Sequence, residues 1–506
     1  MAPGSLLLGV DVGTQSTKGV VATDDGVLVA TATRAHGVDR PAPGFFEHDA
    51  DAVWWDGFVA VTRELLARDD VEAARVAGVG VSGIGPCLLA ADDGGRPLRP
   101  AILYGVDTRA GAQIDELRER FGDDAIQARS RSVMTSQAVG PKLLWLRERE
   151  PQVWDQTRQV LMASSFLVRR LTGAYVLDHH SASGVVPFYD AAGRRWHRPW
   201  VEQALGGDLR LPELAWSDEV AGEVTADAAA ATGLRPGTPV TTGTVDAAAE
   251  ALSAGVREPG DLMLMYGTTM FLIQLVERLP ADTPFWGTCY LWEGLAALAG
   301  GMATSGALTS WFRDVLGEGA PPYESLVAGA ARVRPGSDGL VVLPYFAGER
   351  TPLHEPDARG VVAGLTLDHG RDHLYRALLE ATAYGVRHNL EALEAAGAPP
   401  ARLVGVGGGT QGGLWPQIVA DVTGRPQDVP GQTIGAAYGD ALLAGIATGL
   451  VDRDADWNPP AVRVEPDQRA AAIYHDAYAL YRELHVATAP LQRRLARLGR
   501  EEPRHG

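Results

Sequence analysis

The N-terminal segment carries residues suited to binding an anion together with a metal ion. Its string Asp-x-Gly-Thr-x-Ser-x-Lys comprises Asp11, Gly13, Thr14, Gln15, Ser16, Thr17 and Lys18. A tight turn of glycine and hydroxyl residues exposes successive backbone N–H groups, which can cradle an anion. A carboxylate at the end of a buried strand can hold a hydrated Mg²⁺ beside that anion. The alternative is a plain β-turn capped by Asp11, which explains a bare Gly-Thr turn equally well.

A second carboxylate, Asp246, ends the glycine-rich segment Gly243-Thr244-Val245-Asp246. A carboxylate held next to an alcohol can accept its proton during group transfer. An aspartate that precedes a helix is also a common N-cap residue, and that role involves no chemistry.

A glycine cluster, Gly407-Gly408-Gly409-Thr410-Gln411-Gly412, follows an apolar run and formally contains Gly-x-Gly-x-x-Gly. If the cluster were a dinucleotide-binding fingerprint, Asp428 could be the acidic residue that follows such a motif. This motif is weak alone, and it lies far from where such domains usually begin. The sequence has no Gly-x-x-x-x-Gly-Lys-Ser/Thr string, which excludes a P-loop nucleotide hydrolase.

His369 and His373, with Asp368 and Asp372 nearby, resemble a metal site in composition. Acidic and polar residues also favour the exposed N–H groups at a helix start, and we predict that simpler role. The chain has two cysteines, too few for a disulfide framework or a structural zinc site. Cys87 is expected to be a small buried hydrophobe.

Hydrophobic patterning predicts strands joined by tight turns and followed by helices, which is typical of α/β layers. Strands are predicted at residues 6–10, 19–22, 27–30, 76–81, 239–242, 262–265, 271–276 and 402–406. Helices are predicted at residues 53–66, 109–121, 142–149, 165–172, 247–254, 373–395, 436–448 and 470–497. Strand, Gly-Thr turn and strand occur near residue 11 and again near residue 267, which hints at an internal duplication.

Length and charge narrow the classes of protein. The composition, 46% hydrophobic and 21% charged, is that of a folded protein. A length of 506 residues predicts two or more large domains, which we place at 1–250 and 251–490, followed by a polar tail at 491–506. A net charge of −18 disfavours binding to nucleic acid or to a membrane surface. There is no uncharged apolar run of about 18 residues and no basic leader, so a cytoplasmic protein is expected.

Several motifs resemble a known family. The string at residues 11–18 resembles the first phosphate loop of actin-like ATPases and sugar kinases. Arg359-Gly360, Gly364-Leu365 and the run from His373 to Glu380 resemble the C-terminal signature of FGGY carbohydrate kinases. Residues 142–148 resemble the N-terminal signature, although Val139 stands where Ser, Thr or Pro is usual. The only two lysines of the chain, Lys18 and Lys142, lie in these motifs.

The resemblance implies two actin-like (ribonuclease H-like) α/β domains around a cleft, with ATP mainly on the C-terminal domain and a sugar or polyol mainly on the N-terminal one. It implies that Asp246 is the catalytic base and that Asp11 and Asp246 hold Mg²⁺ through water. ATP and phosphate would contact Gly13, Thr14, Gln15, Ser16, Lys18, Gly267, Thr268, Thr269, Gly306, Ser310, Gly408, Gly409 and Gly412. Substrate would contact Gly85, Pro86, Asp107, Arg109 and Asp246.

The substrate side departs from the family pattern. Ile84-Gly85-Pro86 replaces a polar Gln-Met-His run, the aromatic residue before Asp107 has moved to Tyr104, and Ala247 stands where Asn or Gln is frequent. A pentulose such as xylulose is the leading substrate, with ribulose, a hexulose, a tetritol and glycerol as alternatives. A catalytically silent regulator on the same fold and a nicotinamide oxidoreductase are alternatives of other classes. A homodimer is possible.

Overall fold

The computed structural model describes residues 4–498, which divide into two compact units. The first unit combines Met1–Pro259, Leu275–Leu298 and Ile434–Pro459, and the second combines Gly260–Gln274, Ala299–Thr433 and Pro460–Gly506. Ile434–Pro459 therefore folds with the N-terminal half of the chain, which sequence patterning did not predict. The contiguous boundary near residue 250 remains a prediction. Within residues 4–498, no helix combines the length and the hydropathy needed to cross a bilayer.

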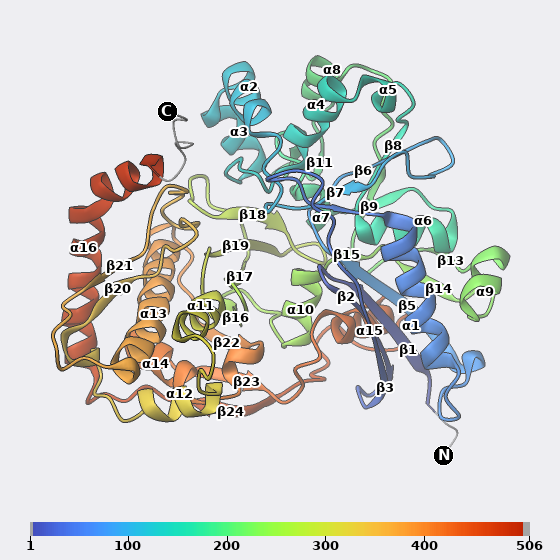
Figure 1. Ribbon diagram of the computed structural model, residues 1–506. Coiled ribbons are helices and arrows are strands. Elements are labelled where there is room, and N and C mark those ends of the chain that lie inside the picture. Colours follow the sequence, from blue (N-terminus) through green and yellow to red (C-terminus); the bar gives the residue numbers. More distant parts are fainter. Residues whose placement is uncertain (1–3, 499–506) are drawn as a thin grey trace. The chain divides into compact units, whose positions relative to one another are not determined.

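The first unit is built on a seven-stranded sheet of order β13-β14-β5-β1-β2-β3, with β15 also paired to β5 (Figure 1). Its strands are β1 (Leu6–Val12), β2 (Ser16–Thr23), β3 (Leu28–Ala35), β5 (Val76–Gly83), β13 (Val220–Glu223), β14 (Pro239–Thr241) and β15 (Thr244–Val245). The first three strands form an antiparallel meander, and β5 lies parallel to β1. β1 is buried along its whole length, as its unbroken apolar run predicts.

Helices cover both faces of this sheet. Gly19 faces α1 (Asp56–Leu66), whereas Gly9 and Gly80 face α15 (Ala436–Ala447). The other helices of the unit are α2 (Gly111–Phe121), α3 (Asp123–Ser130), α4 (Val139–Arg149), α5 (Pro151–Trp154), α6 (Ala163–Thr172), α7 (His179–Ser183), α8 (Arg198–Leu205), α9 (Ala226–Thr232) and α10 (Asp246–Ser253). Short strand pairs complete it: β4 (Glu47–His48) with β7 (Ala101–Ile102), β6 (Leu89–Ala91) with β8 (Gln159–Leu161), β9 (Val176–Asp178) with β12 (Glu213–Ala215), and β10 (Tyr189–Asp190) with β11 (Arg195–Trp196).

A second seven-stranded sheet has the order β18-β19-β17-β16-β22-β23-β24. Its strands are β16 (Asp261–Tyr266), β17 (Met270–Val276), β18 (Trp286–Cys289), β19 (Ala296–Met302), β22 (Arg402–Val406), β23 (Gln427–Pro430) and β24 (Pro460–Val464). One strand of this sheet, β18, lies in the segment Leu275–Leu298 of the first unit. The second unit contains β20 (Val341–Leu343), β21 (Val361–Ala363), α11 (Gly306–Leu316), α12 (Tyr323–Ala330), α13 (Arg371–Ala395), α14 (Leu414–Thr423) and α16 (Ala471–Leu498).

The two sheets repeat one topology, as the predicted duplication requires. In each, a Gly-Thr turn joins an antiparallel hairpin, β1-β2 or β16-β17, and a later strand pairs in parallel with the first strand of the hairpin. The predicted strands and helices all form, with ends shifted by a few residues. The helix predicted at residues 470–497 is α16, so residues 491–498 of the predicted polar tail are helical. Residues 499–506 lie outside the described part of the chain.

The close approach of α15 to β5 yields a stability prediction. A Cβ atom added at Gly80 would lie 1.9 Å from the backbone oxygen of Asp440 on α15. Gly80→Ala should therefore push strand and helix apart and cost about 1–3 kcal/mol, seen as a lower thermal midpoint. Gly111→Ala is the matched control, because nothing lies within 4 Å of its added Cβ. Equal midpoints for the two variants would contradict this account of the packing.

Candidate active site

Asp11 lies at the end of β1, where neighbouring strands bring polar side chains together. It is in register with Lys18 on β2 and with Ser82 on β5. Ser82 Oγ donates a hydrogen bond to Asp11 Oδ1 over 3.2 Å. Burial raises the pKa of Asp11 to about 6, although the Ser82 hydrogen bond and the Lys18 charge act in the opposite direction. This carboxyl is desolvated, so a nearby positive charge would stabilise its ionised form.

The turn that follows β1 remains accessible. The backbone N–H of Gly13 donates to Ser16 O over 3.0 Å and closes the turn. Gln15 and Lys18 are exposed, whereas Gly13, Thr14 and Ser16 are half-buried. The string proposed to bind phosphate can therefore be reached by a ligand, and phosphate binding itself stays a prediction.

Asp246 lies beside the same strand ends. β15 pairs in parallel with the last two residues of β5, and α10 begins directly after it, at Asp246. Val245 occupies the N-cap position, so the alternative that Asp246 is the N-cap residue is wrong. Burial raises the pKa of Asp246 well above its usual value, and the charges of Asp11 and Glu250 raise it further. Because Asp246 is only half-buried, it can still meet a substrate and act as a base.

Two further carboxyls complete this cluster, and sequence reasoning did not single out either. Glu250 lies one helical turn after Asp246, and burial, followed by the charge of Asp11, raises its pKa to about 7. Asp440 on α15 is fully buried, and its Oδ2 accepts a 2.7 Å hydrogen bond from Ser82 Oγ. Its Oδ1 has no partner among the described residues. The i,i+4 spacing from Asp246 could have indicated Glu250, whereas only the fold brings Asp440 here.

The carboxyl cluster fits a hydrated magnesium ion. Its donors are all oxygen atoms, and burial raises the pKa of each carboxyl. Repulsion from neighbouring carboxylates raises the pKa of Asp246, Glu250 and Asp440 further. A divalent cation would relieve that repulsion. Within residues 4–498, no three His, Cys, Asp or Glu side chains form a direct metal-binding group. The arrangement therefore suits Mg²⁺ held through its water shell, the form in which Mg²⁺ usually binds to carboxylates.

Gly85 and Pro86 lie next to the Asp246 segment. A Cβ atom added at Gly85 would lie 2.9 Å from Val245 Cγ2, and one added at Gly184 would lie 2.7 Å from Pro86 Cβ. Gly85 thus adjoins the strand that leads into Asp246, whereas Pro86 packs against Gly184. Cys87 is fully buried, and burial raises the pKa of its thiol to about 12, as expected for an inert hydrophobic residue.

Asp107 and Arg109, also proposed to contact substrate, are engaged with each other. Arg109 Nε and Nη2 donate to the two Asp107 carboxylate oxygens over 2.9 and 2.7 Å, and Nη1 donates to Glu47 Oε1 over 2.7 Å. Both side chains are fully buried. This network holds the loop before β4, because Phe46 N also donates to Asp107. Direct contact of either residue with a sugar stays a prediction.

The second Gly-Thr turn forms a comparable cluster in the second unit. Gly267 O and Thr268 O accept hydrogen bonds from the first N–H groups of α11, those of Gly306 and Ala307, over 2.9 and 3.0 Å. Thr268 is exposed, and Thr269 is half-buried. Ser310 lies one turn along α11, where its Oγ is 3.2 Å from the hydroxyl oxygen of Tyr323. The residues proposed to bind nucleotide on this side therefore converge around one turn.

The glycine cluster joins this group at the end of β22. Added Cβ atoms at Gly407 and Gly409 would lie 2.8 Å from backbone and side-chain atoms of Tyr266, the residue before the turn. These two glycines are thus required by packing. Gly408 has nothing within 4 Å of an added Cβ, and Gly412 has only one side chain, 3.9 Å away. Because no side chain covers the backbone at these two positions, a nucleotide could lie directly against it.

The histidines near residue 370 cap a helix, as predicted. His373 Nδ1 accepts from the backbone N–H of Gly370 over 3.2 Å, directly before α13. His369 Nδ1 accepts from Thr366 N over 2.9 Å. The ring nitrogens therefore serve the loop that leads into α13.

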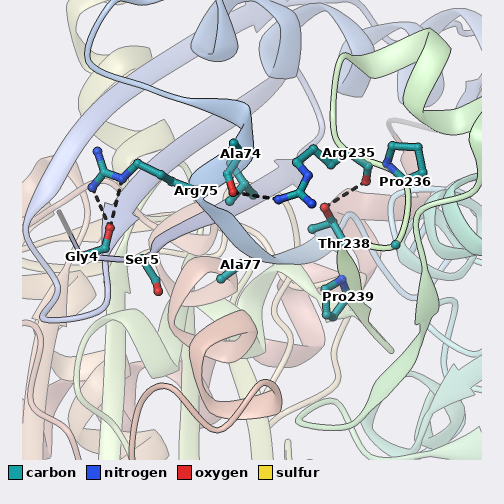
Figure 2. A pocket seen from close by; sticks show the side chains of 11 residues that line it. Gly4, Ser5, Ala74, Arg75, Ala77, Arg235, Pro236, Thr238 and Pro239 are labelled. Carbon is teal, nitrogen blue, oxygen red and sulfur yellow. Dashed lines mark hydrogen bonds between the residues drawn. The ribbon is translucent and has the colours of Figure 1, made fainter. Parts of the chain in front are cut away.

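A cavity of about 350 Å³ lies at the other end of the first sheet (Figure 2). Arg75 Nη2 donates to Gly4 O over 2.6 Å, and Arg235 Nη1 donates to Ala74 O over 3.1 Å. Gly4 and Ser5 precede β1, whereas Asp11 lies near its far end. Because a strand rises ~3.3 Å per residue, Asp11 is about 16 Å from the start of β1. The cavity is thus separate from the carboxyl cluster.

Comparison with known proteins agrees with this geometry. Residues 6–253 match the N-terminal domain of the FGGY family of carbohydrate kinases, and residues 262–448 match its C-terminal domain. Xylulose kinase of Escherichia coli K12 is 28% identical over 492 residues, covering 96% of this chain and 100% of the relative. Glycerol kinase of Trichlorobacter lovleyi is 31% identical over 460 residues, covering 88% and 90%.

The crystal structure of xylulose kinase from Rhodospirillum rubrum has a TM-score of 0.89 to this chain at 34% identity, covering 96% of this chain and 99% of that one. This match confirms the predicted fold of two actin-like, ribonuclease H-like α/β domains. The chain belongs to the FGGY family of carbohydrate kinases, phosphotransferases that act on an alcohol group.

Proposed function

We propose that this kinase transfers the γ-phosphate of ATP to a hydroxyl of a small ketose, a pentulose such as xylulose. The observation that carries the proposal is Asp246, a half-buried carboxyl with a raised pKa beside Asp11. Xylulose kinases among the relatives match nearly the whole chain, and this supports a pentulose as the acceptor.

In the proposed reaction, Asp246 accepts the proton of the acceptor hydroxyl. The hydroxyl oxygen forms a bond to the γ-phosphorus while the bond from that phosphorus to ADP breaks. Asp11, with Asp246, would hold Mg²⁺ through water, and the ion would neutralise charge on the phosphates. The accessible turn from Gly13 to Lys18 offers backbone N–H groups, hydroxyls and one ammonium to the transferred phosphate.

The second unit would hold the nucleotide. Thr268 and Thr269 offer hydroxyls near the phosphates, and Gly408 and Gly412 offer open backbone to the nucleoside. Near Asp246, the acceptor meets Gly85 and Pro86, which carry no side-chain polar group. Each missing hydrogen bond changes selectivity by about 1–3 kcal/mol, so the acceptor must be selected partly by shape.

The substrate is tested by coupled ADP release from Mg–ATP. The panel contains xylulose, ribulose, a hexulose, a tetritol and glycerol, with a control that lacks any sugar. We expect the highest kcat/KM with xylulose. A higher value with a hexulose or a polyol would overturn the pentulose assignment, and flat traces with intact ATP binding would overturn catalysis of this reaction.

The role of the base is tested with Asp246→Asn, which keeps the shape of the side chain but removes proton acceptance. We expect kcat to fall about 10²–10⁴-fold while ATP still binds. Asp227→Asn, an exposed position in the first turn of α9, is the matched control and should retain activity. Full activity of Asp246→Asn would refute the assignment.

The carboxyl cluster also predicts the pH dependence of catalysis. A base works deprotonated, so kcat/KM should fall as pH falls through the raised pKa of Asp246. The charge of Glu250 raises the pKa of Asp246. Glu250→Gln should therefore move the acid limb to lower pH, whereas the exposed control Glu72→Gln should not move it. An unmoved limb in Glu250→Gln would contradict this coupling.

A further inference from the structure

One fully buried carboxylate of the first unit takes no part in the proposed reaction. Asp178, the last residue of β9, is 0% exposed. Removing a carboxylate from water costs free energy unless hydrogen bonds replace its hydration. Sequence reasoning did not single out this residue, and its hydrogen-bond partners show which segments depend on it.

Three donors from three separate segments bind one oxygen of this carboxylate. Asp178 Oδ2 accepts a 3.1 Å hydrogen bond from the backbone N–H of Ser181, in α7. It also accepts from Ser217 Oγ over 3.1 Å and from Thr244 Oγ1, in β15, over 3.0 Å. The other oxygen, Oδ1, has no partner among the described residues. Asp178 thus joins α7, β15 and the segment between β12 and β13 at one point.

Thr244 connects this point to the proposed base. β15 consists of Thr244 and Val245, and Asp246 follows directly at the start of α10. The strand is in register with only two residues of β5, Ser82 and Gly83. So short a strand forms few ladder hydrogen bonds, and side-chain bonds therefore matter for its position. The buried hydroxyl of Thr244 supplies one, and its acceptor is a carboxylate, which makes the bond a strong one.

The same carboxylate holds both elements that pack against the segment proposed to contact substrate. A Cβ atom added at Gly85 would lie 2.9 Å from Val245 Cγ2 in β15. One added at Gly184, directly after α7, would lie 2.7 Å from Pro86 Cβ. β15 therefore packs against Gly85 and the end of α7 against Pro86, and Asp178 ties the two elements together.

We propose that Asp178 is a positioning residue, which holds Asp246 at the acceptor hydroxyl through its hydrogen bond to Thr244. The inference rests on the proposed role of Asp246 as the base. A base must lie within hydrogen-bond distance of the proton that it accepts, and a displacement of about 1 Å can lower the rate about 10²-fold. Loss of the Thr244 hydroxyl should therefore slow catalysis, although this group itself does not touch the substrate.

The chain offers a matched pair of variants. Thr244→Val replaces the hydroxyl by a methyl group, and Ser217→Ala removes the other hydroxyl that donates to the same oxygen. Each variant costs the carboxylate one hydrogen bond, so both should lower the thermal midpoint by similar amounts. We expect kcat for coupled ADP release to fall roughly 10–100-fold in Thr244→Val but less than about 3-fold in Ser217→Ala, with an unchanged KM for ATP. Thr244→Ser keeps the hydroxyl and should restore kcat. Equal kcat values in Thr244→Val and Ser217→Ala, or no rescue by Thr244→Ser, would overturn the proposal.

Asp178 itself is tested by Asp178→Asn, which keeps the shape of the side chain but replaces the carboxylate by a weaker acceptor. We expect kcat to fall about 10-fold in the single variant, and no further when the change is added to Thr244→Val, because both changes act on the same bond. Effects that multiply in the double variant would contradict action through Thr244.

Combining Thr244→Val with Asp246→Asn separates a failure of this inference from a failure of the proposed function. When the base is absent its displacement has no further effect, so the double variant should be as fast as Asp246→Asn alone. A further fall of about 10-fold would show that Thr244 acts by another route and would overturn the inference. Full activity of Asp246→Asn would instead refute the proposed base, which leaves Asp178 no base to position.

Amide hydrogen exchange in the absence of substrate gives a readout that does not depend on the acceptor. The backbone N–H of Ala247 donates to Asp246 Oδ1 over 2.7 Å, so its exchange reports how firmly this segment is held. We expect peptides that cover residues 244–248 to exchange about 5-fold faster in Thr244→Val and at the wild-type rate in Ser217→Ala. Unchanged exchange in Thr244→Val would overturn the anchoring role of Asp178, whichever sugar is the substrate.

Discussion

The crowding of carboxyl groups around Ser82 is the constraint on which the rest of the site depends. Its single hydroxyl lies 3.2 Å from Asp11 Oδ1 and 2.7 Å from Asp440 Oδ2, and Asp246 begins its helix beside the same strand end. Ser82 has one hydroxyl proton and so can donate to only one of the two carboxyls at a time. A desolvated group of this kind stores electrostatic repulsion, which a cation or a transferred proton relieves.

The fold produces this crowding through close backbone contacts. Asp440 reaches Ser82 only because α15 lies almost directly on β1 and β5, where Gly9 and Gly80 leave no room for a Cβ atom. Gly439 makes the same kind of contact with Ala249 O on α10. Small residues thus bring two helices and two strands close enough for their carboxyls to interact.

The sequence predicted the fold and singled out Asp11 and Asp246 as the candidate chemical groups, because periodicity and short motifs are local. The Gly-Thr turns at Gly13-Thr14 and Gly267-Thr268 were visible as strings, and their hairpins formed where predicted. Asp440 could not be predicted in this way, since its segment joins the first unit only by tertiary packing. The pairing of Asp107 with Arg109 was also hidden, because spacing shows that two groups are near but not that they are bonded to each other.

The repeated hairpins differ in charge, which supports the proposed division of the chemistry between the units. Aligning Gly13 with Gly267 places Asp11 at the position of Met265. In the first hairpin Asp11 is in register with Lys18, whereas in the second Met265 is in register with Phe271. The same hairpin thus carries two cross-strand neighbours of opposite charge in one unit and an apolar pair in the other. The first hairpin carries the charged groups Asp11 and Lys18, while the second offers backbone and hydroxyls, which would suit a ligand that brings its own charge.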